Sequence, residues 1–427
     1  MQDQPKGSTR PTLRGQMAAL YASHFVKYLL PLITIPYLAR VLGVRTLGLL
    51  AFIQAFSMLI HQLLEFGFGL SMTKDVARYR DSPEKLARLT SGVVGTQVIL
   101  LVVAVLVTFA AQHTVPLLRQ NPLLLWMGLA VAITQGLNFF WFLRGVEKMQ
   151  QVASLDVLTR LLRTVGIFLL VRNPDDVWLV LASDAVAGAI SAAVGAVIVY
   201  RTVPFRLPSG SEIRATVEES WSLFVVRASA TMFSAGNTFV LGLFVSPTLV
   251  GYFTSAEKIS TAVRMLFTPA FDALYPYMSY DVSKAPQEAF RLMRKAFLQL
   301  EALALLASIG VFIFAPLIVR ILFGAEFEAA VPILRIFAFF PVIVVANNCL
   351  GSHWLLILGY RKIFVSVGVV IGLLNVGLTT LVAVEWPQHG HYGAVIAFML
   401  TQLMATVAFA LFARKVGFTP HPGKARD

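Results

Sequence analysis

The sequence predicts an all-α protein that is embedded in a membrane and crosses it twelve times. Its mean hydropathy is +0.74, and 57% of its residues are hydrophobic while only 13% are charged. Apolar runs long enough to cross a bilayer, which takes about 20 helical residues, recur along the whole chain. Because soluble domains do not carry so many such runs, we expect a polytopic membrane protein.

The polar stretches between the apolar runs are short, so we expect no soluble domain. We divide the chain into a tail (1–14), a first half (15–200), a linker (201–218), a second half (219–413) and a second tail (414–427). The predicted spans are 15–39, 46–68, 88–111, 121–143, 152–172, 177–200, 219–244, 249–279, 292–320, 329–357, 363–385 and 391–413.

Lysine and arginine residues near the spans predict the orientation, because they favour the cytoplasmic side of a membrane. Twenty-three of them fall on the side that holds both termini, and five fall on the opposite side. The count therefore predicts cytoplasmic termini and supports an even number of spans. The formal net charge of +13 arises mainly from residues between apolar segments. Nucleic acid is therefore not an expected partner.

The sequence offers no motif for a bound cofactor. It has neither a P-loop nor a cluster of Cys and His with metal-ligand spacing, and its one cysteine, Cys349, lies in an apolar run. We therefore expect no cofactor, no metal site and no disulfide framework. Any energy source must be the substrate gradient or an ion gradient, with Na⁺ or H⁺ as the candidate ion.

Seven basic residues fall inside predicted spans, where a cation costs about 2.5–3.5 kcal/mol on insertion scales. Lys27 lies roughly 20 Å into the first span, and His24 shares its helical face. Such a lysine either faces a wet cavity or is paired within the bundle for structure alone. Arg160 and Arg163 lie near the cytoplasmic half of span 5, where their side chains can extend toward the interface. The others are Arg227, Lys258, Arg264 and Arg335, the last near the outer end of span 10.

Polar residues recur at helical spacing along spans 2, 7 and 8, which gives each helix one wet face. Hydroxyl stripes also join membrane helices, so a packing role stays open for Ser and Thr alone. Asn347 lies in a polar break of span 10 and either lines the same path or marks a kink. The stripes are Gln54, Ser57, His61 and Glu65; Arg227, Thr231, Ser234 and Thr238; and Thr254, Glu257, Thr261, Arg264, Thr268 and Asp272.

The wet spans occupy matching positions if the chain consists of two six-helix halves, because spans 1 and 2 then correspond to spans 7 and 8. A weak sequence echo supports this arrangement: Thr46-Leu47-Gly48 opens span 2, and Thr248-Leu249-Val250-Gly251 opens span 8. Transporters often place their substrate at the interface between structural repeats. We therefore expect the four wet faces to line one cavity.

The charges along these spans predict that the cavity is cationic in the middle. We place Lys27 and Arg264 near mid-depth, Glu65 and Asp272 near cytoplasmic span ends, and Glu257 near the outer end of span 8. A cationic site between low-dielectric walls concentrates anions, and the planar fork of arginine suits the oxygens of a diphosphate.

Three further residues have local interpretations. Asp184 is a candidate for coupling to an ion, as are Glu65, Glu257 and Asp272. Asp156 either shares that role or pairs with Arg160 or Arg163. Trp141 lies near a span end, a position typical of an aromatic-belt anchor.

Five segments together resemble the bacterial polysaccharide flippases that translocate O-antigen and other repeat units. This family belongs to the multidrug/oligosaccharidyl-lipid/polysaccharide exporter superfamily, and the resemblance extends from about residue 15 to 415. The segments are Pro31–Gly43 (PLITIPYLARVLG) with Leu47-Gly48, Glu65–Gly69 (EFGFG), Trp141–Met149 (WFLRGVEKM), Val250–Ile259 (VGYFTSAEKI) and Pro269–Met278 (PAFDALYPYM).

The resemblance implies two six-helix lobes, related by pseudo-twofold symmetry, around a central cationic cavity lined by spans 1, 2, 7 and 8. Carried over by position, Lys27, Arg227 and Arg264 would be its cations. The implied substrate is an oligosaccharide linked to undecaprenyl (polyprenyl) diphosphate, flipped across a bacterial inner membrane. Polysaccharide polymerase and chain-length proteins would be candidate partners. The alternatives are a lipid II flippase, a multidrug exporter or, in a different class, a membrane-embedded polymerase or ligase.

Overall fold

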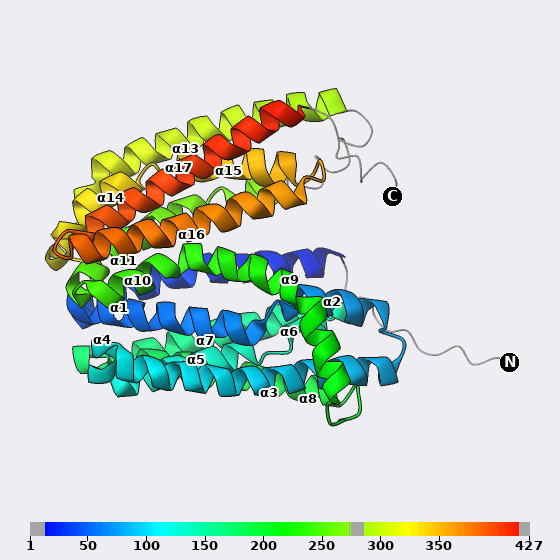
Figure 1. The fold of residues 1–427 in the computed structure, drawn as a ribbon. Coiled ribbons are helices and arrows are strands. Elements are labelled where there is room, and N and C mark those ends of the chain that lie inside the picture. The colour runs from blue at the N-terminus through cyan, green and yellow to red at the C-terminus, as the bar shows by residue number, and fades with distance from the viewer. Residues whose placement is uncertain (1–12, 273, 275–285, 418–427) are drawn as a thin grey trace.

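The structure, a computed structural model, describes residues 13–272, 274 and 286–417. These residues form helices joined by short turns, without a strand in the described ranges. The protein is thus all-α, as the composition predicts. Figure 1 shows two bundles of roughly parallel helices, one above the other. We call α1–α8 the first lobe and α10–α17 the second lobe.

In the first lobe, α1 contains two predicted spans. It is interrupted at Gly43, where φ of 71° and ψ of 172° are not helical. A residue with a Cβ rarely adopts positive φ, so glycine suits this break. The lobe consists of α1 (Leu13–Glu65), α2 (Phe68–Arg78), α3 (Pro83–Thr114), α4 (Pro116–Gln120), α5 (Pro122–Gly136), α6 (Phe140–Gly145), α7 (Met149–Leu170), η1 (Pro174–Asp176) and α8 (Val177–Tyr200).

The second lobe is entered through α9 (Gly210–Ser234), which begins against α3 and continues to pack against α16. Ser209 caps its start, because the Ser209 hydroxyl accepts the Glu212 N–H while the Glu212 carboxylate accepts the Ser209 N–H. The remaining helices are α10 (Gly236–Phe244), α11 (Pro247–Met265), α13 (Pro286–Leu322), η2 (Ala325–Ala330), α14 (Val331–Phe337), α15 (Phe340–Asn347), η3 (Asn348–Leu355), α16 (Arg361–Glu385) and α17 (Gly390–Val416).

Eight helical stretches among the described residues are long and apolar enough to cross a membrane. Helices also cover all or part of the other predicted spans, which are 15–39, 152–172, 219–244 and 249–279. Of these, 152–172 and 249–279 each contain at least three charged side chains, which lower their mean hydropathy. The helices that contain these two spans, α7 and α11, are therefore less suited to lipid by composition than the eight stretches above.

The two lobes touch most closely at the end that holds Gly43, which we call the closed end. A Cβ added to Gly48 of α1 would lie 1.8 Å from the Pro247 carbonyl oxygen, and one added to Gly251 of α11 would lie 2.3 Å from the Val44 carbonyl oxygen. Small residues of this kind let membrane helices approach with their backbones in contact. The two segments of the sequence echo thus meet at the lobe interface.

Polar contacts reinforce the closed end. Arg40 donates to the Ile321 carbonyl at 2.6 Å, and Glu326 accepts the Val44 N–H at 3.2 Å, next to the break in α1. Deeper in the interface, Phe52 of α1 stacks on Phe239 of α10, with ring centroids 5.5 Å apart.

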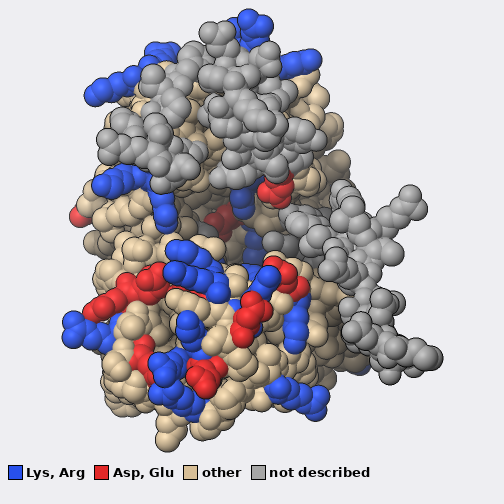
Figure 2. All heavy atoms as spheres, turned by 90° about the vertical axis from the view of Figure 1, so that its right-hand side faces the viewer, with Lys and Arg blue, Asp and Glu red and all other residues tan. Residues whose placement is uncertain are grey.

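The other end of the bundles, which we call the basic end, carries Arg78, Lys148, Arg201, Arg361 and Arg414. Figure 2 views this end and shows a hollow between the lobes, with acidic and basic side chains inside it and around it. Among the described residues, the lobes are therefore in contact at the closed end and separated by this hollow at the basic end.

Candidate functional site

A cavity of about 130 Å³ lies at the basic end of the first lobe. The last turn of α1, the start of α2, α3, the turn between α5 and α6, and α9 all contribute to its wall. Its polar lining residues are His61, Glu65, Gln97, Asn138, Trp141, Arg144 and Arg227. We call this the charged cavity.

Glu65 orders the corner between α1 and α2. Its carboxylate accepts the backbone N–H groups of Gly67 and Gly69 at 3.0 and 2.8 Å, where the chain turns through positive φ at Phe66 and Gly67. The same carboxylate lies 3.6 Å from the Arg227 guanidinium. Glu65, predicted as an ion-coupling residue, is therefore already bonded to the backbone and to a cation.

Arg227 is the exposed partner of this pair. Its side chain is 47% exposed, against 14% for Glu65. One carboxylate at 3.6 Å leaves most of the five guanidinium N–H donors available on its open side. Arg227 therefore suits an anion that enters the charged cavity from the basic end.

A second group of charges lies on α7 and α8 of the first lobe and on α11 of the second. Arg163 of α7 forms an ion pair with the buried Asp184 of α8 at 2.8 Å. Lys258 of α11 interacts electrostatically with Arg163 and with its neighbour Glu257. Arg163 and Lys258, one cation from each lobe, therefore repel each other. We call Arg163, Asp184, Glu257 and Lys258 the interlobe charge group.

Glu257 is the acid of this group on the second lobe. It forms a hydrogen bond with Thr238 of α10 and interacts electrostatically with Lys258 and Arg264. Lys258 lies eleven residues after Pro247, roughly 17 Å along α11 at about 1.5 Å per residue. Glu257 and Lys258 therefore lie near the middle of α11, whereas Arg264 lies in its last turn, nearer the basic end.

The other predicted site residues separate into three sets. Thr231 is buried and donates to the Gln62 side chain at 3.1 Å, whereas Gln54 and Thr261 are half-buried and Asp272 is exposed. Asn347 lies in a different cavity, beside Gln402 of α17. The side chains of His24, Lys27 and Ser234 lie outside the described residues.

Three interpretations of single residues are settled by their contacts. Trp141 is 3% exposed and lines the charged cavity, so the aromatic-belt prediction for it is wrong. Asp156 pairs with Arg160 at 3.0 Å, one helical turn away. Arg163 was expected to extend toward the interface, but a buried acid on the next helix holds it. The sequence spacing of Asp156, Arg160 and Arg163 predicts that they share one face of α7. It does not predict that Arg163 pairs with an acid of α8.

The described part of the chain contains no group of three or more His, Cys, Asp or Glu side chains suited to a metal ion. The cations of the charged cavity and of the interlobe charge group are instead single side chains with carboxylate partners. Such pairs can exchange one anion for another, because a guanidinium or ammonium binds phosphate oxygens as well as carboxylate oxygens.

Three comparisons show what this chain is similar to. It is 26% identical over 411 residues to a protein of Escherichia coli K12 assigned as an O-antigen transporter, covering 94% of this chain and 97% of that protein. It is 24% identical over 272 residues to a protein of Haloferax volcanii assigned as a low-salt glycan biosynthesis flippase, covering 63% of this chain and 51% of the other.

Among solved structures, the fold is similar to the lipid II flippase MurJ in an inward closed conformation. The TM-score is 0.72 at 14% identity, over 93% of this chain and 87% of MurJ. At that identity the likeness concerns the fold alone. The family model for polysaccharide biosynthesis proteins matches residues 14–280, which is more than half of the chain. The chain therefore belongs to the polysaccharide biosynthesis protein family, as its resemblance to the polysaccharide flippases predicts.

Proposed function

We propose that this protein flips a polyprenyl-diphosphate-linked oligosaccharide from the cytoplasmic to the periplasmic leaflet of a bacterial inner membrane. The observation that carries the proposal is the hollow between the lobes, which has basic and acidic side chains inside it and around it, together with Arg227 in the charged cavity at the same end. The hollow is open at the basic end and shut by backbone contacts at the other. The assignment of relatives to O-antigen transport and glycan flipping supports the substrate class.

The proposed cycle is alternating access by rocking of the two lobes. With the basic end facing the cytoplasm, the diphosphate enters the hollow and binds Arg227, and the polyprenyl chain stays in the lipid. The diphosphate then displaces carboxylates from the cations of the interlobe charge group. Separation of Gly48 from Gly251 opens the closed end to the periplasm.

An inward flux of Na⁺ or H⁺ is the proposed driving force. Glu257 and Asp184 are the proposed coupling residues, because each interacts with a cation of the interlobe charge group. A change in the charge of either acid alters how strongly its cation attracts an anion. Loss of an imposed proton or sodium gradient should then slow flipping, and replacing Glu257 with Gln should remove that dependence.

The function is tested with variants that remove one positive charge, from the charged cavity or from the interlobe charge group, and keep a side chain of similar volume. Arg227→Gln and Lys258→Met should reach the membrane in normal amounts and leave the lipid-linked repeat unit on the cytoplasmic face. The matched controls are Arg214→Gln, on the same helix as Arg227 with an 81% exposed side chain, and Lys362→Met, which is exposed at the start of α16. Full flipping by both chamber variants would refute the proposed anion site.

The rival functions give different results in a deletion strain. If the protein is a flippase, its deletion leaves lipid-linked repeat units facing the cytoplasm. If it is a polymerase or ligase, its deletion leaves them on the periplasmic face. A strain depleted of its lipid II flippase that grows when this chain is expressed would assign lipid II as the substrate instead.

A further inference from the structure

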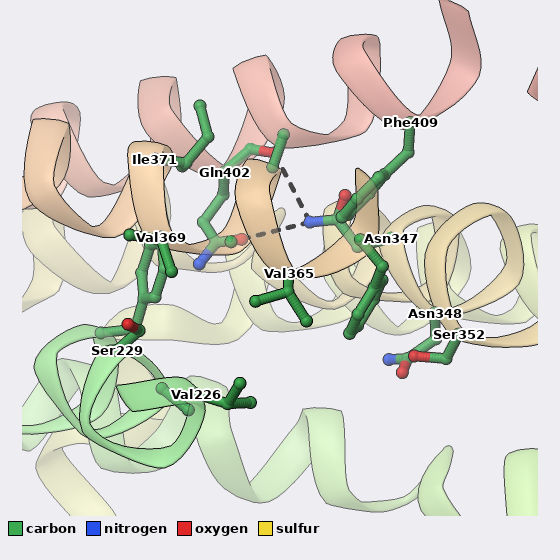
Figure 3. Close-up of a pocket in the computed structure, with 15 residues that line it drawn as sticks. Val226, Ser229, Asn347, Asn348, Ser352, Val365, Val369, Ile371, Gln402 and Phe409 are labelled. Atoms are coloured by element: carbon green, nitrogen blue, oxygen red, sulfur yellow. Dashed lines mark hydrogen bonds between the residues drawn. The ribbon is translucent and has the colours of Figure 1, made fainter. Parts of the chain in front are cut away.

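A second cavity, of about 340 Å³, lies wholly among helices of the second lobe and α9. Figure 3 shows Val226 and Ser229 of α9 on one side of it, with α16, α17 and the α15–η3 segment on the other. Aliphatic and aromatic residues form most of its wall. Its polar lining consists of Ser229, Asn347, Asn348, Ser352 and Gln402, all neutral. We call this the neutral cavity.

Several hydrogen-bonding groups in this wall are not used within the described structure. Asn347 is fixed, because its amide donates to the Gln402 Oε1 at 3.1 Å and its Oδ1 accepts from Thr406 at 2.9 Å. Asn348 donates to the Val344 carbonyl at 3.0 Å. Among the described residues, the Asn348 Oδ1, the Gln402 NH₂ group and the Ser352 hydroxyl have no hydrogen-bond partner. The wall thus offers both donors and acceptors to a ligand.

The backbone of η3 explains why two of these groups share one side. Asn348–Leu355 forms a π-helix, a rare conformation that often occurs at functional sites. Asn348 and Ser352 lie one wide turn apart on it, and both line the cavity.

The chemistry of the wall selects among the three parts of the proposed substrate. A diphosphate would find no cation in the lining. A polyprenyl chain would cover the three unused groups, on Asn348, Ser352 and Gln402, without replacing their hydrogen bonds to water, at about 1–3 kcal/mol for each group left unpaired. A neutral sugar brings hydroxyl donors and acceptors, and its C–H faces can pack on Phe233, Phe364 and Phe409. The volume lies at the lower end of small-ligand sites, roughly 300–1,000 Å³.

Helix α9 separates the two cavities. Arg227 lines the charged cavity, and Val226, the preceding residue, lines the neutral cavity. Consecutive residues of an α-helix point roughly 100° apart, so one helix can present different chemistry to each side. A sugar chain attached to a diphosphate in the charged cavity would have to extend around this helix, which is about 10 Å wide.

We propose that the neutral cavity is a saccharide subsite that binds uncharged sugar residues of the lipid-linked oligosaccharide. This inference rests on the proposed function. The charged cavity binds the diphosphate, and the neutral cavity reads the sugars beyond it. The amide and hydroxyl side chains of the neutral cavity would therefore determine which repeat units are accepted.

The test measures binding to the purified protein of three compounds prepared from one source. The lipid-linked repeat unit is extracted from the deletion strain, its oligosaccharide is released by mild acid, and undecaprenyl diphosphate serves as the sugar-free counterpart. Gln402→Leu and Ser352→Ala should each weaken binding of the lipid-linked unit by about tenfold, equivalent to roughly 1.4 kcal/mol, and leave binding of undecaprenyl diphosphate unchanged. Ser352→Ala removes a single oxygen, so it tests the site even if the larger change disturbs folding.

The controls separate this inference from the function on which it rests. Gln112→Leu, at a glutamine that bonds Trp126 on the first lobe, should change neither affinity. Arg227→Gln should weaken the binding of both lipids, and unchanged binding of both would overturn the proposed function. Equal weakening of both lipids by Gln402→Leu would instead assign the cavity to the polyprenyl chain. Unchanged binding of all three compounds in both cavity variants would overturn the subsite. Tight binding of the released oligosaccharide alone would assign the cavity to a free sugar.

Discussion

Replacing Gly48 with Ala tests whether the closed end is a gate that must separate. The added Cβ would lie 1.8 Å from the Pro247 carbonyl oxygen and 2.6 Å from the Gly251 nitrogen. Ordinary contact begins near 3.4 Å, so the α11 backbone must retreat by about 1.6 Å, the difference between 3.4 and 1.8. Both obstructing atoms belong to the backbone, so no side chain can rotate out of the way.

The expected magnitude follows from the cost of overpacking, about 1–3 kcal/mol. That energy is lost only in the conformation with the closed end shut, so the population should shift toward an open end by roughly fivefold to more than a hundredfold. Thr254 lies nearly one turn beyond Gly251 on α11 and is 2% exposed. A cysteine at this position, in a Cys349→Ser background, should become more accessible in the Gly48→Ala variant.

The assay is the rate at which a membrane-impermeant maleimide labels Thr254→Cys in whole cells. Gly377→Ala is the matched control, because a Cβ at that position has nothing within 4 Å. The reasoning is refuted if Gly48→Ala leaves both the labelling rate and flipping at the level of this control.

Three further predictions concern stability. Asn375→Ala should lower the free energy of unfolding by about 1–3 kcal/mol, because the Asn375 amide donates to Asn237 at 2.7 Å in a fully buried position; thermal unfolding in detergent measures the loss. Asp184→Asn should lower the free energy of unfolding by about 1–3 kcal/mol, which is less than for a fully buried ion pair because the Arg163 side chain is 41% exposed. Adding Arg163→Met should restore the melting temperature, and no recovery would contradict the prediction. The pKa of Glu212 is lowered by a hydrogen bond from the Ser209 N–H, and then by the Ser91 and Ser209 hydroxyls and by Arg206. The stabilisation that the Glu212 carboxylate provides should therefore be complete above the ordinary glutamate pKa and be lost as pH falls through the lowered value. Proteolysis of residues 201–209, which precede α9, should increase over that acidic range in the wild type and not in Glu212→Gln.

The sequence alone determined the class of the protein and the positions of its helices. Membrane insertion depends on the length and polarity of each segment, and both can be read locally. The same local information showed that Arg227, Lys258 and Arg264 lie in helices otherwise suited to lipid, and that Asp156 and Arg160 lie within reach of each other.

Only the tertiary structure decided which charges meet. The rotation of each helix and the breaks at Gly43 and after Met265 set the direction of every side chain, and no local pattern encodes them. For this reason Glu65 bonds the α2 backbone, Arg163 pairs with the next helix, and Asn347 lies in the neutral cavity rather than with the charged stripes.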